Sequence, residues 1–157
     1  MTQDEILQNL VKKFPYLEGK IRAPRARRIF SDDITANFDE VFNYAVNDLG
    51  FSILCTITGL DEGDKIGFIY HIARIDGTIL SIKKSSPKSD PVIKTITPQF
   101  FGADIYEREL MDLLGVRVEG LPVGNRYPLP DNWPKGEYPL RKDWKKPGAK
   151  EESKPNE

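Results

Sequence analysis

Five prolines lie within eighteen residues near the end of the sequence, at Pro122, Pro128, Pro130, Pro134 and Pro139. Each proline fixes φ at about −65° and removes a backbone donor, so this segment cannot be a helix or a central strand. It also carries large apolar side chains that are costly to leave in water, namely Tyr127, Leu129, Trp133, Tyr138, Leu140 and Trp144. We therefore predict that residues 119–144 form an extended tail that lies over a protein surface.

The residues before this tail have the spacing of an amphipathic helix. At about 100° per residue, one side of that helix would carry the apolar side chains of Tyr106, Leu110, Leu113 and Leu114. The opposite side is charged, and there Arg108 and Asp112 are placed to form an i,i+4 ion pair. Gly115 follows where a helix C-cap glycine is expected.

Glu107 and Glu109 lie on the two borders of the apolar side. Removing a carboxylate from water is expensive unless it gains a cation or several donors, and the residues that follow the helix supply the cations Arg117, Arg126, Arg141 and Lys142. The helix places the two carboxylates about 160° apart, so they cannot converge on one small substrate. We predict an ion-pair network, within the chain or with a partner, rather than acid–base catalysis.

Helix and tail together resemble a known signature. The sequences GADIYERELMDLLGV and YPLRKDW are similar to the 30 kDa subunit of respiratory complex I and its homologues in energy-converting membrane-bound hydrogenases and related archaeal complexes. The matching residues are Glu107, Arg108, Glu109, Asp112, Gly115, Gly120, Pro122, Arg126, Trp133, Pro139, Leu140, Arg141, Lys142 and Asp143. Two charged motifs in the right order, joined by a matching middle, make this signal specific.

The resemblance implies a non-catalytic structural subunit on the cytoplasmic, peripheral side of a membrane complex. It implies partners: a hydrogenase-like large catalytic subunit, a small iron–sulfur subunit and, through them, membrane ion-pumping subunits. Iron–sulfur clusters, and in hydrogenases nickel–iron, would belong to those partners, and this chain would hold no cofactor. Apart from Gly120 and Pro122, the matching residues are the candidate partner interface.

One position bears on which complex is involved. Leu121 stands between Gly120 and Pro122, where the respiratory form usually has a histidine, and the following residues 123–128 also depart from its pattern. With the shortness of the chain, this resembles the energy-converting hydrogenases, which couple ferredoxin-linked proton reduction to ion pumping, or their sulfur-reducing relatives. An NADH:quinone or other quinone-reducing dehydrogenase is the alternative, and a redox-unrelated adaptor is an alternative of another class.

Composition excludes several other functions. The 157 residues, 39% hydrophobic and 30% charged, are enough for one globular domain with its own core. A net charge of −1 provides no general attraction for nucleic acid or an anionic membrane, and no run approaches the roughly 20 apolar residues of a membrane span. With one Cys and one His, the chain cannot by itself build an iron–sulfur cluster or a nitrogen/sulfur zinc site.

Single residues receive plainer interpretations. We expect Cys55, within the apolar run FSILCTITGL, to be a buried thiol. We expect His71 to be a structural or surface residue, since no metal partner is near it in sequence. The cations within residues 20–28 are expected to form a solvated or partner-facing edge rather than an RNA site, because aromatic residues are not interleaved among them.

The remaining pattern predicts an α+β fold. Helices are expected after a Thr2–Glu5 capping box and after Thr35, an extended segment at 19–30, and strands at 51–60, 66–75, 78–83 and 92–97. Asp76-Gly77 predicts a hairpin, residues 84–91 a loop, and Thr97-Pro98 the start of the signature helix. Helices would pack on one face of a mostly antiparallel sheet, giving an α+β domain at 1–118, an extended partner-docking tail at 119–144 and a disordered C-terminus at 145–157.

Overall fold

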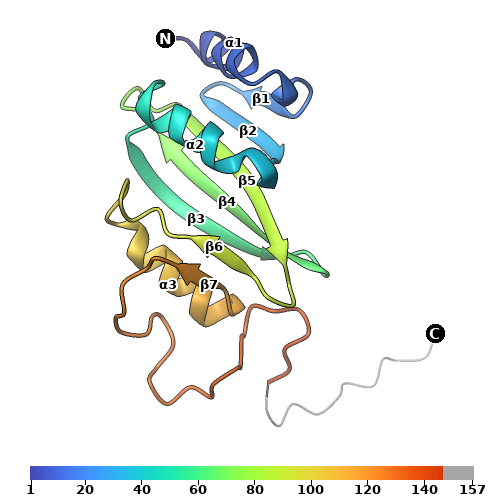
Figure 1. Ribbon diagram of the computed structural model, residues 1–157, viewed down its shortest axis with the longest axis vertical. Coiled ribbons are helices and arrows are strands. Elements are labelled where there is room, and N and C mark those ends of the chain that lie inside the picture. Colours follow the sequence, from blue (N-terminus) through green and yellow to red (C-terminus); the bar gives the residue numbers. More distant parts are fainter. Residues whose placement is uncertain (147–157) are drawn as a thin grey trace, which may run out of the picture.

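The computed structural model describes residues 1–146 (Figure 1). Its elements are α1 (Gln3–Lys13), η1 (Pro15–Leu17), β1 (Ile21–Arg25), β2 (Arg28–Asp33), η2 (Thr35–Asn37), α2 (Phe38–Asn47), β3 (Ile53–Asp61), β4 (Lys65–Ala73), β5 (Ile79–Pro87), β6 (Val92–Lys94), α3 (Ala103–Leu114) and β7 (Arg117–Glu119). The C-terminus predicted to be disordered, 145–157, lies outside the described residues except for residues 145 and 146.

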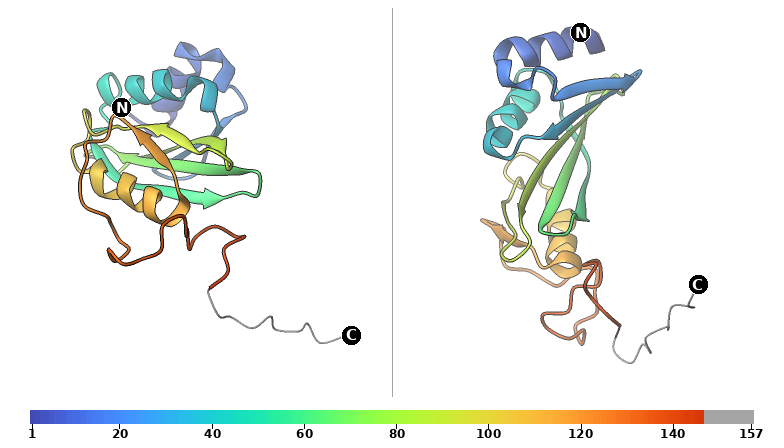
Figure 2. Two further views of the ribbon diagram at one scale, coloured as in Figure 1. Left: turned by 60° about the horizontal axis from the view of Figure 1, so that its bottom comes forward. Right: turned by 90° about the vertical axis from the view of Figure 1, so that its right-hand side faces the viewer.

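Five strands form one sheet in the order β1-β2-β5-β4-β3. Neighbours are antiparallel except for β2 and β5, which are parallel. In the edge-on view of Figure 2, α2 lies against one face of this sheet. α3 packs on the same face beneath β3, because Gly59, which pairs with the core-facing Phe68, lies against Leu110 and Leu114. The predicted fold class, helices on one face of a mostly antiparallel sheet, is confirmed.

The core forms where α2 meets the middle of the sheet. On β4, every second residue from Ile66 to Ile72 is fully buried, because alternate side chains of a strand point to the same face of the sheet. The ring centroids of Phe38 and Tyr70 are 4.6 Å apart, and that of Phe42 lies 6.1 Å from Phe100. These aromatic contacts join α2, β4 and the loop before α3 into one core.

The opposite face of the sheet carries His71. Its Nδ1 lies 2.8 Å from the Ser81 hydroxyl of β5, and burial lowers the pKa of the imidazole. The residue is half-buried and hydrogen-bonded within the sheet, in agreement with the structural role expected from the sequence.

Local sequence signals predicted the ends of several elements correctly. The Thr2 side chain accepts from the Glu5 amide, and the Glu5 carboxylate accepts from the Thr2 amide, which completes the capping box. Gly77 in the hairpin has φ of 81°, and its amide donates to the Arg74 carbonyl. A left-handed residue at this point is what the Asp-Gly turn provides.

Several predicted boundaries were wrong, and the strand expected at 92–97 ends already at Lys94. Thr35 is not a helix N-cap, because its hydroxyl donates to Asp33 instead and α2 begins at Phe38. Residues 84–87 continue β5 rather than forming a loop, because β4 pairs with them as far as Pro87. The helix expected from Thr97-Pro98 begins only at residue 103, after a loop. For residues 84–87, the pairing with β4 replaced the local preference for a loop.

The extended segment predicted at 19–30 is a hairpin. β1 and β2 pair antiparallel, and the turn between them places Arg27 at φ of 59°. Pro24 lies within β1, which is an edge strand, where a missing backbone donor is tolerated.

Cys55 is exposed, so the prediction of a buried thiol was wrong. It lies on β3, the other edge strand, at an irregularity in the pairing with β4 between Leu54 and Thr56. The apolar run around it suggested a central strand, but an edge strand with a bulge leaves this side chain in solvent.

A second, two-stranded sheet joins the start of the tail to the body. β6 and β7 pair in parallel, with Val92 opposite Arg117 and Lys94 opposite Glu119. The pairing extends one residue past the predicted domain boundary at 118. From there the tail passes along α3 and around its C-terminal end (Figure 1).

Candidate functional site: the signature helix and its tail

α3 carries the first half of the signature, and its buried side is centred differently from the prediction. Leu110 and Leu114 are buried as expected, whereas Tyr106 and Leu113 are only half-buried on the flank facing β3. Glu107 is fully buried, with no exposed surface. A carboxylate thus occupies the middle of the helix face that packs on the body.

Glu107 is held by the loop before the helix rather than by the tail. Its carboxylate accepts from the Thr95 hydroxyl at 2.6 Å and from the Ile96 amide at 2.8 Å. The expectation that tail cations would meet this carboxylate was therefore wrong. Burial raises the pKa of the Glu107 carboxyl, and the two hydrogen bonds oppose that change. The residue fixes the loop 95–102 against α3.

The predicted pair between Arg108 and Asp112 does not form. The Arg108 guanidinium lies 2.8 Å from Asp104 and also donates to the Pro122 carbonyl at 2.8 Å. Gly124 lies directly beside Arg108, where an added Cβ would come within 2.5 Å of the guanidinium. Arg108 therefore contacts the first part of the tail rather than the next turn of its own helix.

Asp112 is the carboxylate that meets a tail cation. It lies 2.9 Å from Arg126 and also accepts from the Leu129 amide at 3.0 Å. Arg126 in turn donates to the Trp133 carbonyl at 3.0 Å. Both members of the pair are largely shielded from solvent, where charge-assisted hydrogen bonds are stronger than at an open surface. The tail does fold back on its own domain, and Asp112 is its first anchor.

The C-terminal end of α3 is the second anchor. Gly115 has φ of 71° and caps the helix, as predicted. The Leu140 amide donates to the Leu113 carbonyl at 3.0 Å, and Arg141 Nε donates to the Leu114 carbonyl at 2.7 Å. Arg141 also lies over the Tyr138 ring, 4.8 Å from its centroid. Its cation thus meets the negative end of the helix rather than a carboxylate of this chain.

Lys142 and Asp143 make the third anchor, at the end of β3. The Lys142 amide donates to Asp61 at 2.8 Å, and the Lys88 ammonium lies 2.8 Å from Asp61 and 2.9 Å from Asp143. The hydrogen bond from Lys88 holds the pKa values of both carboxyls below their usual range. One lysine therefore bridges the body and the tail.

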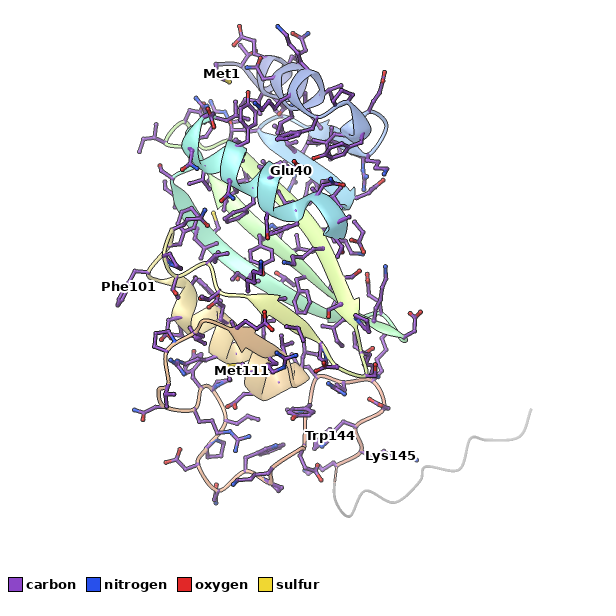
Figure 3. The ribbon with its side chains drawn as sticks, in the orientation of Figure 1. Met1, Glu40, Phe101, Met111, Trp144 and Lys145 are labelled. Carbon is purple, nitrogen blue, oxygen red and sulfur yellow. The ribbon has the colours of Figure 1, made fainter. Side chains whose placement is uncertain are left out.

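The aromatic residues of the tail partly pack on one another. The Trp133 and Trp144 ring centroids are 6.0 Å apart. Their indole nitrogens donate to the carbonyl and the carboxylate of Glu137, respectively, and Pro139 is half-buried close by in sequence. Outside this cluster Val123, Tyr127 and Leu140 remain exposed. Figure 3 shows the side chains along this loop, with Trp144 labelled.

Glu109 stands apart from the rest of the signature. It is half-buried on the flank of α3 that faces β3, in a groove beside Thr56 and Thr58. Within residues 1–146, no cation or hydrogen-bond donor meets its carboxylate. The structure thus brings the signature residues together around α3 but leaves Glu109 on an uncovered side.

Sequence reasoning missed Thr95, Asp61 and Lys88, which hold Glu107 and the end of the tail. Asp61 and Lys142 are 81 positions apart, and no local pattern connects them. The parallel pairing of β6 with β7 was also missed, although the alternation of Val116 and Val118 was a weak signal for it.

Neither a metal-binding cluster nor a membrane-spanning helix occurs in the part of the chain that the structure describes. Within residues 1–146, no group of three or more His, Cys, Asp or Glu side chains is arranged to hold a metal ion. No helix in the same range is long and apolar enough to cross a bilayer.

Comparison with known proteins identifies the family. Residues 34–150 match the family described as respiratory-chain NADH dehydrogenase, 30 Kd subunit. The chain belongs to this family. Its members among the relatives are subunits of oxidoreductase complexes, and the signature helix and tail lie within the matched range.

Three similar proteins illustrate the range of such complexes. A subunit of the F(420)H(2) dehydrogenase of Methanosarcina mazei is 34% identical over 144 residues, which cover 88% of this chain and 89% of the relative. The membrane-bound hydrogenase subunit beta of Pyrococcus furiosus is 39% identical over 89 residues, 54% of this chain and 51% of the relative. A chain of the membrane-bound sulfane sulfur reductase, an archaeal respiratory membrane complex, has a TM-score of 0.75 at 25% identity, covering 90% of this chain and 85% of the other.

Proposed function

We propose that the chain is a non-catalytic structural subunit of a membrane-associated, complex I-related oxidoreductase. In this role it braces a hydrogenase-like large catalytic subunit and a small iron–sulfur subunit on the cytoplasmic side of the membrane. It reaches the ion-pumping membrane subunits only through them. The iron–sulfur clusters and any nickel–iron centre belong to the partners, and this chain holds no cofactor.

The main support for the proposal is that the charged signature residues make structural contacts within the chain. Glu107 fixes a loop, Asp112 holds Arg126, and Arg141 caps a helix. Each of these contacts shapes a surface and none converges on a common point where a substrate would react. Residues that maintain the shape of a surface, rather than react with a substrate, are what a docking subunit requires.

The exposed apolar residues of the tail are the expected contact points. Val123 is fully exposed, Leu140 is 55% exposed and Tyr127 is 42% exposed. Such side chains on a polar, proline-stiffened segment are well suited to bury in the pockets of a partner, where a few apolar anchors supply most of the affinity.

Two observations bear on the kind of complex, and they favour different kinds. The similarity to the sulfane sulfur reductase chain and to the hydrogenase subunit beta supports a hydrogenase or sulfur-reducing complex, in agreement with Leu121. The longer match to the F(420)H(2) dehydrogenase relative favours a dehydrogenase as the second candidate. Metal analysis of the isolated complex tests for a hydrogenase, since a nickel-containing large subunit would identify one.

Affinity purification of the tagged chain from its native cells tests the proposal. We expect a large catalytic subunit and an iron–sulfur subunit to copurify, and Val123→Glu to reduce their recovery by about tenfold, equivalent to about 1.4 kcal/mol. Ile75→Glu, at an equally exposed apolar residue in the β4–β5 turn, is the matched control. Recovery of partners unrelated to redox chemistry would favour an adaptor, and turnover of hydrogen, NADH or quinone by the isolated chain would overturn the non-catalytic assignment.

A further inference from the structure

The five-stranded sheet has two edges, and only one of them is protected. β1 has five residues and contains Pro24 together with the exposed Arg22 and Arg25. Proline and charge on an edge prevent another strand from adding to it. β3 has nine residues, and neither a charge nor a proline occurs from Ile53 to Leu60.

The free side of β3 has few partners in the described chain. Within residues 1–146, the backbone of residues 53–60 hydrogen-bonds to the backbone of β4 alone. One side chain, the Tyr106 hydroxyl, donates to the Cys55 carbonyl at 3.0 Å. A long, uncharged edge with open peptide groups is a template for pairing with another chain.

α3 lies beside this edge of the sheet. In Figure 1 the helix lies below β3, on the side away from β4 and β5, and it packs against β3 at Gly59. Glu109 and Leu113 of that flank, together with Thr56–Gly59 of β3, line a groove of about 210 Å³, and Leu140 of the tail also lines it. The groove borders the edge along which a sixth strand would pair.

Exposed apolar side chains surround the same region. Phe101 is 90% exposed, Ile105 is 45% exposed, and Ile53 on β3 is 44% exposed. Figure 3 shows Phe101 pointing into solvent just before α3. Phe101, Ile105, Glu109 and Leu113 are spaced four residues apart, so they follow one line along the helix and the turn before it.

We infer that this groove receives an extended segment of a partner subunit, which adds to β3 as a sixth strand. Alternate side chains of that segment would be apolar and lie on Leu113, while a Lys or Arg lies beside Glu109. In this mode of recognition, main-chain hydrogen bonds supply affinity and side-chain pockets supply specificity. The inference rests on the proposed function, because it needs the chain to be part of a complex.

Charge argues for such a partner over two other occupants. Glu109 is half-buried, its carboxylate has no cation within the described residues, and a basic partner residue would supply one. A second copy of this chain would bring a second uncharged β3 but no cation from that strand. Residues 147–157 of this chain contain two prolines and no large apolar side chain, so they do not match the apolar groove.

Cys55 makes a direct test possible, because it is the sole cysteine of the sequence and is exposed on β3. Alkylation of Cys55 and amide hydrogen exchange of residues 56–60 are measured in the intact complex and in the isolated chain. We expect both to be at least about tenfold slower in the complex, because strand addition covers the edge. Glu109→Lys should restore the fast rates in the complex preparation, and Glu109→Gln should do so in part.

Each other outcome has a defined meaning. If partner subunits copurify but Cys55 and residues 56–60 react as fast as in the isolated chain, the strand site is wrong while the proposed function stands. If no partner copurifies, the proposed function itself fails. Protection that appears in the isolated chain overturns the inference, and it indicates self-association if it depends on concentration, or cover by residues 147–157 if their deletion abolishes it. Wild-type alkylation decides the question even if Glu109→Lys does not fold.

Discussion

The body of the molecule and its tail are held in place by different forces. The body, residues 1–118, is built on a continuous core of buried apolar side chains, including Phe42, Tyr70 and Leu110. The tail contributes no residue to that buried core and is held by polar contacts with Arg108, Asp112, the end of α3 and Lys88. Apolar burial is non-directional and cooperative, whereas ion pairs are local and sensitive to pH. A substitution in the core should therefore destabilise the whole body. Loss of one tail contact should loosen only the tail residues around it.

The largest expected effect is in the core. Phe42→Ala removes a ring that packs on Phe38, Tyr70 and Phe100, and it should lower the free energy of unfolding by about 3–5 kcal/mol. Urea denaturation followed by circular dichroism measures the change. Ile75→Ala, at a residue 91% exposed, is the control and should change stability by less than about 0.5 kcal/mol. A comparable loss in both variants would contradict the assignment of the core.

A buried polar contact in the body should have an intermediate effect. Glu107→Leu leaves the Ile96 amide without its acceptor, so we expect a loss of about 1–3 kcal/mol. Glu107→Gln keeps that acceptor and removes a desolvated charge, and its stability should stay close to that of the wild type. Equal losses in both variants, measured by thermal denaturation, would show that the charge itself is required.

An anchor of the tail should fail without unfolding the body. Arg126→Ala removes the cation at Asp112 and the donor to the Trp133 carbonyl, and we expect about 1–2 kcal/mol of local destabilisation. Amide exchange should accelerate around Leu129 and remain unchanged in β4. Lys135→Ala, at a neighbouring exposed cation, is the matched control. A uniform increase in exchange across the sheet would show that tail and body unfold as one unit.

Acid should release the last anchor of the tail, and this is the smallest effect expected. The pKa values of Asp61 and Asp143 are lowered by Lys88, so their contribution is complete above about pH 4. It is lost as the pH falls through the lowered values in the folded state. Trp144 fluorescence should report this release, and Lys88→Met should move it to higher pH. No shift in that variant would show that Lys88 does not couple the two carboxylates.

The sequence predicted features whose cause is local. Thr2 and Glu5 cap each other across one turn, and Gly115 ends its helix because of its own φ. The α+β class followed from such units together with the alternation on β4. The resemblance identified the family because its motifs need only the linear order of residues.

The missed features depend on contacts between distant segments. Glu107 was expected to pair with cations of the tail. Thr95 and Ile96 bind its carboxylate instead, because the loop before α3 lies over the buried side of that helix. Cys55 was expected to be buried, because an apolar strand at an edge has the same sequence pattern as one in the centre. Only the strand order, with β3 outermost, distinguishes the two.

Gly115 connects two events that are usually independent. A side chain at this position would strain the left-handed backbone, and its Cβ would also lie 2.5 Å from the Tyr138 ring. A single methyl group at this position would therefore disturb the C-terminal end of α3 and displace Tyr138 with the tail around it. A substitution at Gly115 therefore cannot alter the end of the helix without also altering the path of the tail.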